Sequence, residues 1–412
     1  MCYPQRYRTL LWSYSTREPG VNRSGSLDRG KRMPIGVAFI VGQLSLGGAE
    51  QQLYYFLSGL DRSHFRPVVI TLGPKSDEYW VQPIVSLGIP VLHVPRRLGR
   101  ALRTFRIAAI LRCKRVQMVH GWDLHTNPYS AVAGRLAGTP VRLGSMRFNY
   151  EVILTEKLVR WMGYRGLDVM VANSTVAANQ LRELRLTKAK VRLLPNGVPI
   201  PEIVSEGDRL RLKSELGFSS ADLVIGSIGR LDVNKNYAML LRVFAALITQ
   251  WKRLRLVIIG DGPLKSELVA MAQALGIAAK VSLPGAIPLA ARYLPAMDAC
   301  CLTSYTEGMP NVIMEAAAAG LPVVSTRCGD SGDLIEDGVS GYLVSRDDDV
   351  RMSARLDRLL TYPQQRSQMG QAAREKMRRE FSVNSMVAGM TRLYEEVLAE
   401  KRLACVRPRT EA

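Results

Sequence analysis

The chain lacks most of the features that mark secreted, membrane-spanning or metal-dependent proteins. Its six cysteines include no Cys-x-x-Cys pair, which favours a reduced, cytoplasmic setting. No apolar run reaches the roughly 18 residues that a membrane-spanning helix needs, and the opening residues lack the apolar core of about 7–15 residues that a secretion signal requires. No group of His, Cys and Asp has metal-ligand spacing. We therefore expect a protein that needs no metal and is neither exported nor inserted in a membrane.

Acidic residues are scarce relative to basic ones. The 412 residues carry 56 Lys and Arg against 36 Asp and Glu, a formal net charge of +20. The densest stretch, residues 96–115, holds eight Lys or Arg and no acid, and it includes a helix-like segment at 102–112. A basic amphipathic face of this kind can dock on anionic lipid, each basic group contributing about 1 kcal/mol. An ordinary solvated helix face is the alternative; we expect no nucleic-acid partner, since no recognised module is present.

What the chain does contain is a regular alternation of short apolar strands and helical segments. Residues 1–33 are a basic, polar tail with seven Lys or Arg and two acids, either a flexible arm or a stretch upstream of the true start. The first clear strand is Ile35–Val41, and residues 195–201 have the turn chemistry of a linker. Strands separated by helices predict an α/β protein with parallel sheets. We place one Rossmann-like domain at 34–197, a second at 198–385, and a closing helix at 386–412 that returns to the first domain.

The most informative segment is 304–320, in which Glu307 and Glu315 stand eight residues apart. Glu307 lies in a Gly- and Pro-containing turn, and Glu315 lies about one turn into an Ala-rich helix. A helix N-terminus suits an anion, whereas a carboxylate there suits sugar or ribose hydroxyls. With Gly308 and Asn311 inside it, this pattern resembles the signature of the GT4-type retaining glycosyltransferases, over nearly the whole chain after residue 34. The resemblance implies the GT-B fold, two facing Rossmann-like domains with a deep cleft between them.

A basic pair, Arg230 and Lys235, follows the first strand of the second domain. Negative charge develops on a nucleoside diphosphate as it leaves the sugar. Fixed cations therefore stabilise the transition state more than the bound donor. The resemblance implies that both side chains hold the donor diphosphate and that Glu315 holds the ribose. It also implies that backbone N–H groups near Gly308 and Asn311–Val312 reach the sugar and phosphate. We expect a nucleotide-sugar co-substrate, UDP-sugar rather than GDP-sugar, and no further cofactor.

The resemblance also gives Glu307 a catalytic role against the transferred sugar. Two mechanisms retain anomeric configuration: front-face attack within an ion pair, and double displacement through a covalent intermediate. The second needs a carboxylate beneath the anomeric carbon. Because nothing in the sequence shows such geometry, we favour the front-face route, in which the departing phosphate accepts the acceptor's proton.

The first domain offers candidates for both substrates. Gly47 and Gly48 lie in a turn between a strand and a helix, where backbone can approach a donor phosphate closely. His120 ends a strand where the family often has His-x-His, and we expect it to be a second catalytic residue in the cleft. His125 is a weaker sugar contact, and for both histidines the alternative is a structural role. Arg147 stands where many relatives place a His and is expected to meet an anionic acceptor or the diphosphate.

Two acidic segments are given no binding role. The run 347–349 is similar to the metal-binding D-x-D motif of another glycosyltransferase fold, but it follows a strand and is better explained as a helix start. The loop 329–333 occupies the place of a Gly-rich family loop that usually ends in Glu. Here Asp333 shortens that carboxylate, which leaves a sugar contact there in doubt.

The sequence therefore predicts a cytoplasmic, metal-independent, retaining glycosyltransferase that is peripheral on the inner face of the membrane. Its acceptor is expected to be a growing glycan or a lipid-linked saccharide, in cell-surface polysaccharide or glycolipid biosynthesis. A nucleotide-sugar epimerase with the same fold is the enzymatic alternative. A non-catalytic basic protein that binds polysaccharide or nucleic acid is the alternative from another class.

Overall fold

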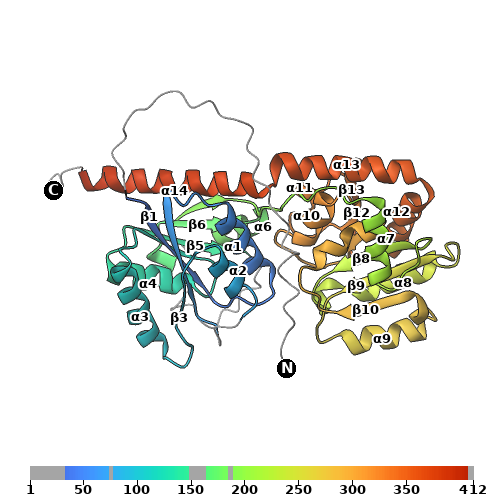
Figure 1. Cartoon of the computed structure of the whole chain (residues 1–412), viewed down its shortest axis with the longest axis horizontal. Coiled ribbons are helices and arrows are strands. Elements are labelled where there is room, and N and C mark those ends of the chain that lie inside the picture. Colours follow the sequence, from blue (N-terminus) through green and yellow to red (C-terminus); the bar gives the residue numbers. More distant parts are fainter. Residues whose placement is uncertain (1–32, 74–77, 148–163, 184–188, 407–412) are drawn as a thin grey trace. The chain divides into compact units, whose positions relative to one another are not determined.

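A computed structural model describes residues 33–73, 78–147, 164–183 and 189–406. The described residues from Pro34 onward belong to one compact unit. They build two parallel sheets, each flanked by helices (Figure 1). We call the sheet formed before residue 194, with its helices, the first half, and the sheet formed after residue 222, with its helices, the second half.

The first half alternates strands and helices from its first strand onward. Its strands are β1 (Ile35–Val41), β2 (Phe65–Thr71), β3 (Val91–His93), β4 (Met118–Gly121), β5 (Val141–Met146), β6 (Val169–Ala172) and β7 (Lys190–Leu193). Its helices are α1 (Gly48–Gly59), α2 (Val81–Ser86), α3 (Arg100–Cys113), α4 (Asn127–Ala137) and α6 (Thr175–Glu183). Helix α4 shows the local signals that set such bounds: it has Pro128 in its first turn, and Gly138 at its end adopts a φ of +71°.

The second half repeats the pattern. Its strands are β8 (Leu223–Ile228), β9 (Leu254–Ile259), β10 (Val281–Gly285), β11 (Ala299–Leu302), β12 (Val323–Thr326) and β13 (Gly341–Val344). Its helices are α7 (Glu206–Glu215), α8 (Tyr237–Leu247), α9 (Lys265–Ala274), α10 (Asn311–Ala318), α11 (Ser331–Leu334), α12 (Asp349–Thr361) and α13 (Pro363–Glu380), with short 3-10 turns at Val233–Lys235, Ala278–Lys280 and Ala290–Ala296. The last helix, α14, spans Val383–Val406.

Both sheets are parallel throughout. The first has the order β3-β2-β1-β4-β5-β6-β7, and the second has the order β10-β9-β8-β11-β12-β13. The register sets Val37 of β1 against Met118 of β4, and Ala299 of β11 against Ile225 of β8. The strand order reverses at β1/β4 in one sheet and at β8/β11 in the other, and ligands of such sheets bind beyond the carboxyl ends of the strands at this point. The predicted α/β class with two Rossmann-like halves is confirmed.

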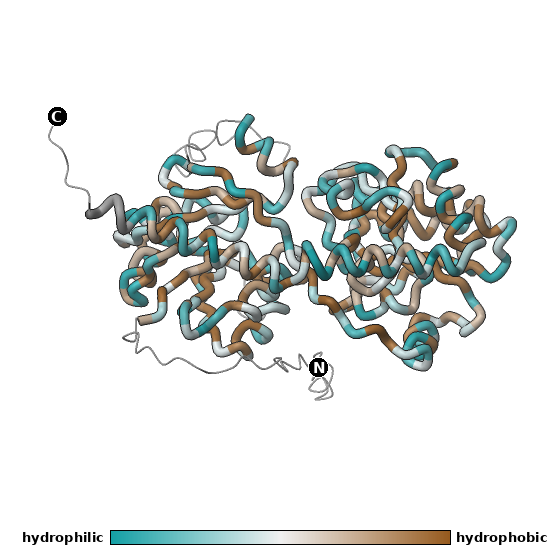
Figure 2. Tube along the Cα trace, turned by 90° about the horizontal axis from the view of Figure 1, so that it is seen from above, coloured by the Kyte–Doolittle hydropathy of each residue, from teal (hydrophilic) through white to brown (hydrophobic). Residues whose placement is uncertain are grey.

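Each half has its own apolar core, made where strand side chains meet the inward faces of the helices. Figure 2 shows brown, apolar stretches inside each half and teal, polar stretches on the outer helices. The paired cysteines Cys300 and Cys301 of β11 are fully buried and serve as small apolar residues of this kind. Burial raises the pKa of the Cys300 thiol to about 12, so the reactive thiolate is suppressed.

Helix α14 packs on the first half although it follows the second in sequence. Met390 and Tyr394 belong to the same buried cluster as Phe39 of β1 and Phe56 of α1, and α14 runs beside the first sheet in Figure 1. The chain therefore passes between the halves twice, before α7 and before α14. The two passages are hydrogen-bonded to each other, since the N–H of Val198 donates to the carbonyl of Phe381 at 2.8 Å.

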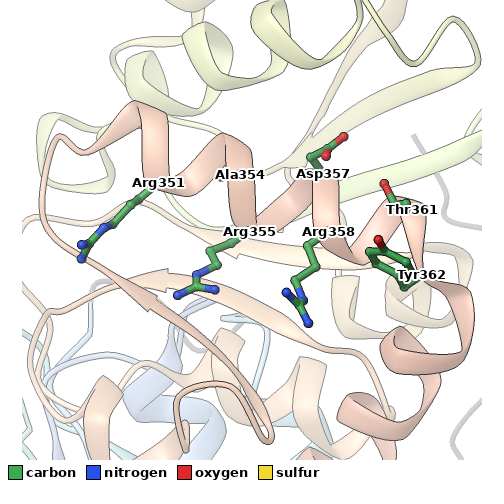
Figure 3. Close-up of a pocket in the computed structure, with 7 residues that line it drawn as sticks. All are labelled: Arg351, Ala354, Arg355, Asp357, Arg358, Thr361 and Tyr362. Atoms are coloured by element: carbon green, nitrogen blue, oxygen red, sulfur yellow. The ribbon is translucent and has the colours of Figure 1, made fainter.

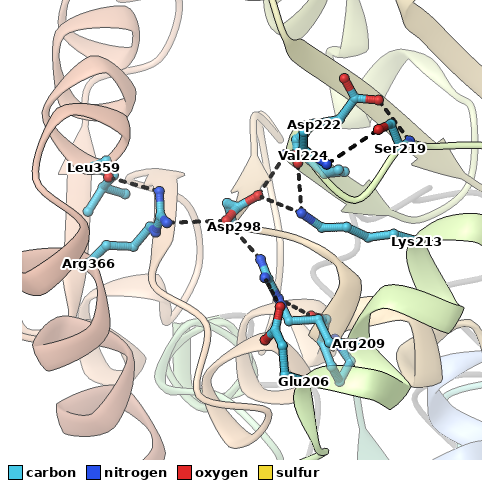
Figure 4. A network of polar contacts seen from close by, with 11 residues as sticks. Glu206, Arg209, Lys213, Ser219, Asp222, Val224, Asp298, Leu359 and Arg366 are labelled. Atoms are coloured by element: carbon cyan, nitrogen blue, oxygen red, sulfur yellow. Dashed lines mark hydrogen bonds and ion pairs between the residues drawn. The ribbon is translucent and has the colours of Figure 1, made fainter.

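A buried polar network ties the second half together at the amino end of β11, the edge opposite the switch-point loops (Figure 4). Asp298 is 4% exposed, and its carboxylate lies 2.9 Å from Arg209 and 3.3 Å from Arg366. It also accepts from the backbone N–H of Val224 at 2.8 Å and lies 3.7 Å from Nζ of Lys213. One carboxylate thus joins α7, α13 and β8, and each of its partners compensates part of the cost of burying the charge.

Candidate active site

The loops that leave the switch-point strands carry most of the predicted site residues. The loop after β1 contains Gly47, the end of β4 contains His120, the loop after β8 contains Arg230 and the loop after β11 contains Glu307. Since the strands of each sheet are parallel, each pair of loops emerges at one edge of its sheet. The fold therefore brings together residues that lie far apart in sequence, and it does so where ligands of this architecture bind.

The closest contact among these residues is an ion pair between Lys235 and Glu307. Nζ of Lys235 lies 2.6 Å from Oε1 of Glu307, and the two side chains are only 17% and 10% exposed. Lys235 ends the 3-10 turn after β8, and its carbonyl accepts from the Thr303 hydroxyl at 2.8 Å, which fixes the turn against the end of β11. A short ion pair in such shelter from water is a strong electrostatic feature of the site.

Arg230 lies in the same loop but points into solvent. Its side chain is 73% exposed, and its nearest acidic partner, Asp232, is 3.8 Å away. The two predicted cations are nevertheless neighbours within one loop, since Lys235 packs against Gly229, the residue before Arg230. A Cβ added to Gly229 would lie 3.6 Å from Nζ of Lys235. The loop thus offers one sheltered and one exposed positive charge.

Helix α10 carries the second predicted glutamate. Glu315 is partly buried, and it accepts a hydrogen bond from Nε2 of Gln51 on α1 at 3.0 Å. Burial raises the pKa of Glu315 to about 7, although the Gln51 bond acts against this. Val312, in the first turn of α10, is buried with only 6% of its surface exposed. This carboxylate is therefore held in an environment that disfavours its charge, as is common at functional sites.

Asn311 and the glycines at the start of α1 contact each other directly. Gly47 is the N-cap of α1, and the carbonyl of Gly48 accepts from Nδ2 of Asn311 at 3.2 Å. A Cβ on Gly48 would lie 2.6 Å from that amide nitrogen, so a larger residue there would displace the Asn311 side chain from this contact. The Asn311 oxygen accepts from Nδ2 of Asn196 at 2.8 Å. The first predicted glycine loop and the predicted donor helix are thus neighbours.

His120 lies in the interior of the first half. It is fully buried, with Nδ1 2.7 Å from the Tyr394 hydroxyl and Nε2 2.7 Å from the Ser145 hydroxyl. Burial and the nearby Arg147 charge lower its pKa well below the ordinary value, so the ring is neutral. Both ring nitrogens are engaged, and this environment supports the structural alternative rather than direct catalysis.

Arg147 is held beside His120 by an aromatic ring. Its guanidinium lies 3.7 Å from the centre of the Trp122 ring, and one terminal nitrogen donates to Asn196 at 3.2 Å. Within the described residues, the buried Nε of Arg147 has no hydrogen-bond partner. Burial lowers the Arg147 pKa to about 10, so the group is positive at neutral pH and can accept another anion. His125 is exposed, and its backbone N–H donates to Asp123.

Glu50 is a potential site residue that sequence reasoning missed. It lies in the first turn of α1, and burial, helped by the charges of Asp123 and Glu78, raises its pKa to about 7. Its position three residues after the predicted glycine at 47 is the signal that could have identified it. The other two acids are used locally: Asp123 accepts from the N–H of Gly42, and Glu78 accepts from the N–H of Leu44.

Asp347, Asp348 and Asp349 act as local structural groups. Asp348 accepts from the N–H of Arg351 at the start of α12, as expected for a helix N-cap. Asp347 accepts from Asn236 at 2.9 Å, and Asp349 pairs with Arg242. Among the described residues, no group of three or more His, Cys, Asp or Glu is arranged to hold a metal ion. No helix in the same part of the chain is long and apolar enough to cross a membrane.

A pocket of about 380 Å³ lies on α12, away from these residues (Figure 3). Its lining consists of Arg351, Ala354, Arg355, Asp357, Arg358, Thr361 and Tyr362. Three guanidinium groups extend from the same side of the helix, and that of Arg355 lies 4.7 Å from the centre of the Tyr342 ring. None of the predicted site residues lines this pocket, so it is not part of the candidate active site.

Comparisons with known proteins identify the family. The family model described as Glycosyltransferase Family 4 matches residues 46–201, and the model described as Glycosyl transferases group 1 matches residues 208–376. The chain is similar to the N-acetyl-alpha-D-glucosaminyl L-malate synthase of Bacillus anthracis, with 26% identity over 316 residues that cover 76% of each protein.

A second relative is the N-acetylgalactosamine-N,N'-diacetylbacillosaminyl-diphospho-undecaprenol 4-alpha-N-acetylgalactosaminyltransferase of Campylobacter jejuni, 29% identical over 56% of this chain and 64% of its own length. Among solved structures, Anabaena Alr3699/HepE in complex with UDP has a similar fold, with a TM-score of 0.77 at 18% identity, over 88% of this chain and all of that one. The same Anabaena protein has also been solved with UDP-glucose, with a TM-score of 0.75. The two family models match the two halves in turn, and the chain belongs to the group 1, GT4-type family of glycosyltransferases, with the GT-B fold.

Proposed function

We propose that this glycosyltransferase moves a sugar from a UDP-sugar to a glycan or lipid-linked saccharide with retention of anomeric configuration. The observation that carries the proposal is the sheltered pair of Lys235 and Glu307, 2.6 Å apart at the carboxyl ends of β8 and β11, with Arg230 in the same loop. A leaving diphosphate needs cations, and a transferred sugar needs hydrogen-bond acceptors for its hydroxyls. This pair supplies one of each side by side.

In the proposed donor complex, Lys235 and Arg230 hold the diphosphate oxygens. A Lys ammonium has three N–H donors, so Lys235 can keep its bond to Glu307 and still donate to a phosphate oxygen. The exposed Arg230 side chain is free to swing onto the other phosphate. Backbone N–H groups near Gly308 and at Asn311–Val312, in the first turn of α10, add fixed donors.

The ribose is proposed to bind at Glu315 and the phosphate of the donor to approach Gly47 and Gly48. Two ribose hydroxyls can replace Gln51 as hydrogen-bond donors to the Glu315 carboxylate. These bonds would favour the charged form of Glu315 and so offset the burial that raises its pKa. UDP is favoured over GDP because the structurally similar Anabaena protein has been solved with UDP and UDP-glucose.

The chemical step is a front-face displacement. The acceptor oxygen bonds to the anomeric carbon as the bond from that carbon to the UDP oxygen breaks, and the acceptor's proton passes to the departing phosphate. Glu307 orients the sugar through its hydroxyls and is the catalytic residue of the proposal. The positive charges of Lys235 and Arg230 stabilise the departing phosphate, so the step as proposed requires no metal ion.

The acceptor side is assigned to the first half. Arg147, whose Nε has no hydrogen-bond partner among the described residues, can meet an anionic acceptor, and His125 is the exposed candidate for a sugar contact. From the interior, His120 joins β4 to Ser145 of β5 and to Tyr394 of α14. A diphosphate-linked saccharide, the kind of acceptor that the name of the Campylobacter relative specifies, would satisfy Arg147 and is our preferred acceptor class.

The basic stretch at 96–115 is proposed to dock on an anionic membrane, which would bring a lipid-linked acceptor to the first half. On α3, Leu102 and Phe105 are 57% and 61% exposed between arginines, an arrangement suited to the lipid interface. The protein would then be cytoplasmic and peripheral on the inner face of the membrane.

Anomeric configuration provides the test of retention. The protein is incubated with UDP-glucose, whose sugar is α-linked, and with octyl glycosides ending in glucose, galactose or N-acetylglucosamine as acceptor probes. We expect an α-linked product by proton NMR, and a β-linked product would overturn retention. UDP release without any glycoside product would favour the epimerase alternative, and no UDP release at all would favour the non-catalytic alternative.

A further inference from the structure

The loop between β12 and α11 joins the two halves through the turn that carries Glu307. Gly329 adopts a φ of +52°, and a Cβ there would collide with the carbonyl oxygens of Glu307 and Gly308. The next residue, Asp330, donates its backbone N–H to the carbonyl of Gly308 at 2.9 Å. The loop therefore packs on the Glu307 turn so closely that neither can shift without the other.

The side chain of Asp330 reaches the first half. Oδ2 accepts from the backbone N–H of Thr175 at 2.6 Å, and Oδ1 accepts from that of Val176 at 3.4 Å. These are the first two residues of α6, and Ser174 caps the third N–H of the helix, on Ala177, at 3.1 Å. Asp330 thus completes the cap of a helix that belongs to the other half, and a carboxylate is favoured there by the helix dipole.

The contact between Asp330 and α6 is sheltered from solvent, and it forms only while the two halves are docked. Asp330 is only 5% exposed. If α6 moved away, the carboxylate would lose two N–H donors and the helix would lose two acceptors. Asp333 supports the same contact more weakly, 3.5 Å from the Thr175 hydroxyl. Asp330 is the stronger link because both its oxygens and its backbone N–H are engaged.

We infer that Asp330 is a positioning residue that couples α6 of the first half to the Glu307–Gly308 turn of the second. The turn then holds its working position only while the two halves are docked, so donor binding to the second half alone does not complete the site. This inference rests on the proposed role of Glu307 in sugar transfer.

The test separates turnover from nucleotide binding. In Asp330→Ala, kcat for UDP release from UDP-glucose should fall on the order of 10- to 100-fold, because a misplacement of about 1 Å can have an effect of this size. The dissociation constant for UDP should rise by no more than a few fold, since Arg230, Lys235 and Glu315 of the second half supply most of the proposed contacts and only Gly47 and Gly48 lie in the first. Asp330→Asn keeps an acceptor oxygen and should retain more of kcat. The matched control is Asp348→Ala, which removes the same kind of cap within the second half and should leave kcat unchanged.

A second variant removes the shorter of the two hydrogen bonds from the other side. Thr175→Pro deletes the donated N–H at the first helical position, where proline is well tolerated. It should reproduce the kcat loss of Asp330→Ala even if the latter folds poorly. Wild-type kcat in Thr175→Pro, or in a folded Asp330→Ala, would overturn the inference.

Small-angle scattering gives a readout that does not depend on activity. With UDP bound, the radius of gyration should be larger in both variants than in the parent. If the parent releases no UDP from UDP-glucose, the proposed function fails, and scattering alone decides the coupling. Equal radii in parent and variants would then overturn the inference.

Discussion

Replacing Glu315 by Gln should stabilise the free protein, and more so at high pH. Burial raises the pKa of Glu315 from an ordinary 4.5 to about 7. The folded protein therefore binds this proton more tightly than the unfolded chain does. The resulting stabilisation is complete below pH 4.5 and is lost as the pH rises through about 7. Glutamine carries no charge, so it escapes this loss.

The size of the effect follows from the pKa shift. A change from 4.5 to about 7 corresponds to an upper value of about 3 kcal/mol at about 1.4 kcal/mol for each unit. Glu315 is only partly buried, so water screens part of the penalty, and we expect about 1–2 kcal/mol at pH 8. For a unit of about 200 residues this is a rise in Tm of about 2–8 °C.

The assay is thermal unfolding of the parent and Glu315→Gln at pH 5 and pH 8. The Tm difference should be small at pH 5 and should reach its full size at pH 8. Glu267→Gln, at an exposed position on α9, is the control and should change Tm little at either pH. An equal Tm difference for Glu315→Gln at both values would refute the reasoning, because it would show that the charge of Glu315 is not what destabilises the fold.

Three further predictions follow from the same contacts. Glu307→Gln should lower kcat by about 100-fold while leaving the UDP dissociation constant within about twofold, measured by UDP release and calorimetry; parallel loss of both would contradict its role at the sugar. Asp298→Asn should destabilise the second half by about 3–5 kcal/mol in urea unfolding, because it leaves Lys213 buried without its partner charge, whereas Glu215→Gln in an exposed pair should cost at most about 1 kcal/mol. Phe105→Glu should weaken sedimentation with phosphatidylglycerol vesicles, whereas Val350→Glu on the second half should not; equal binding by both variants would remove α3 from the docking surface.

Much of the fold could be predicted from local pattern. The strand bounds at Ile35–Val41 agree with the sequence prediction, because an apolar β-rich run between turn residues leaves little choice. The predicted turn at Gly47 and Gly48 is only partly a turn, because Gly48 is already the first residue of α1.

The site was predictable only in part, because its contacts join residues that are remote in sequence. Lys235 follows β8 and Glu307 follows β11, and these strands are neighbours in the parallel sheet. The strand order therefore determines that the two side chains lie close together. No local signal revealed that His120 would be enclosed by Tyr394, since α14 returns from the far end of the chain. The bond from Gln51 to Glu315 and the cap that Asp330 places on α6 likewise depend on how the halves dock.

The most direct test of the account is UDP binding by the parent, Arg230→Ala and the control Arg211→Ala, which removes an exposed arginine of the same half. UDP at about 100 times its dissociation constant should stabilise the parent by about 2.7 kcal/mol, visible as a rise in Tm. We predict that this rise persists in Arg211→Ala and is largely lost in Arg230→Ala. A parent that UDP does not stabilise, or an Arg230→Ala variant that UDP stabilises equally well, would contradict the assignment of the donor site to the loop after β8.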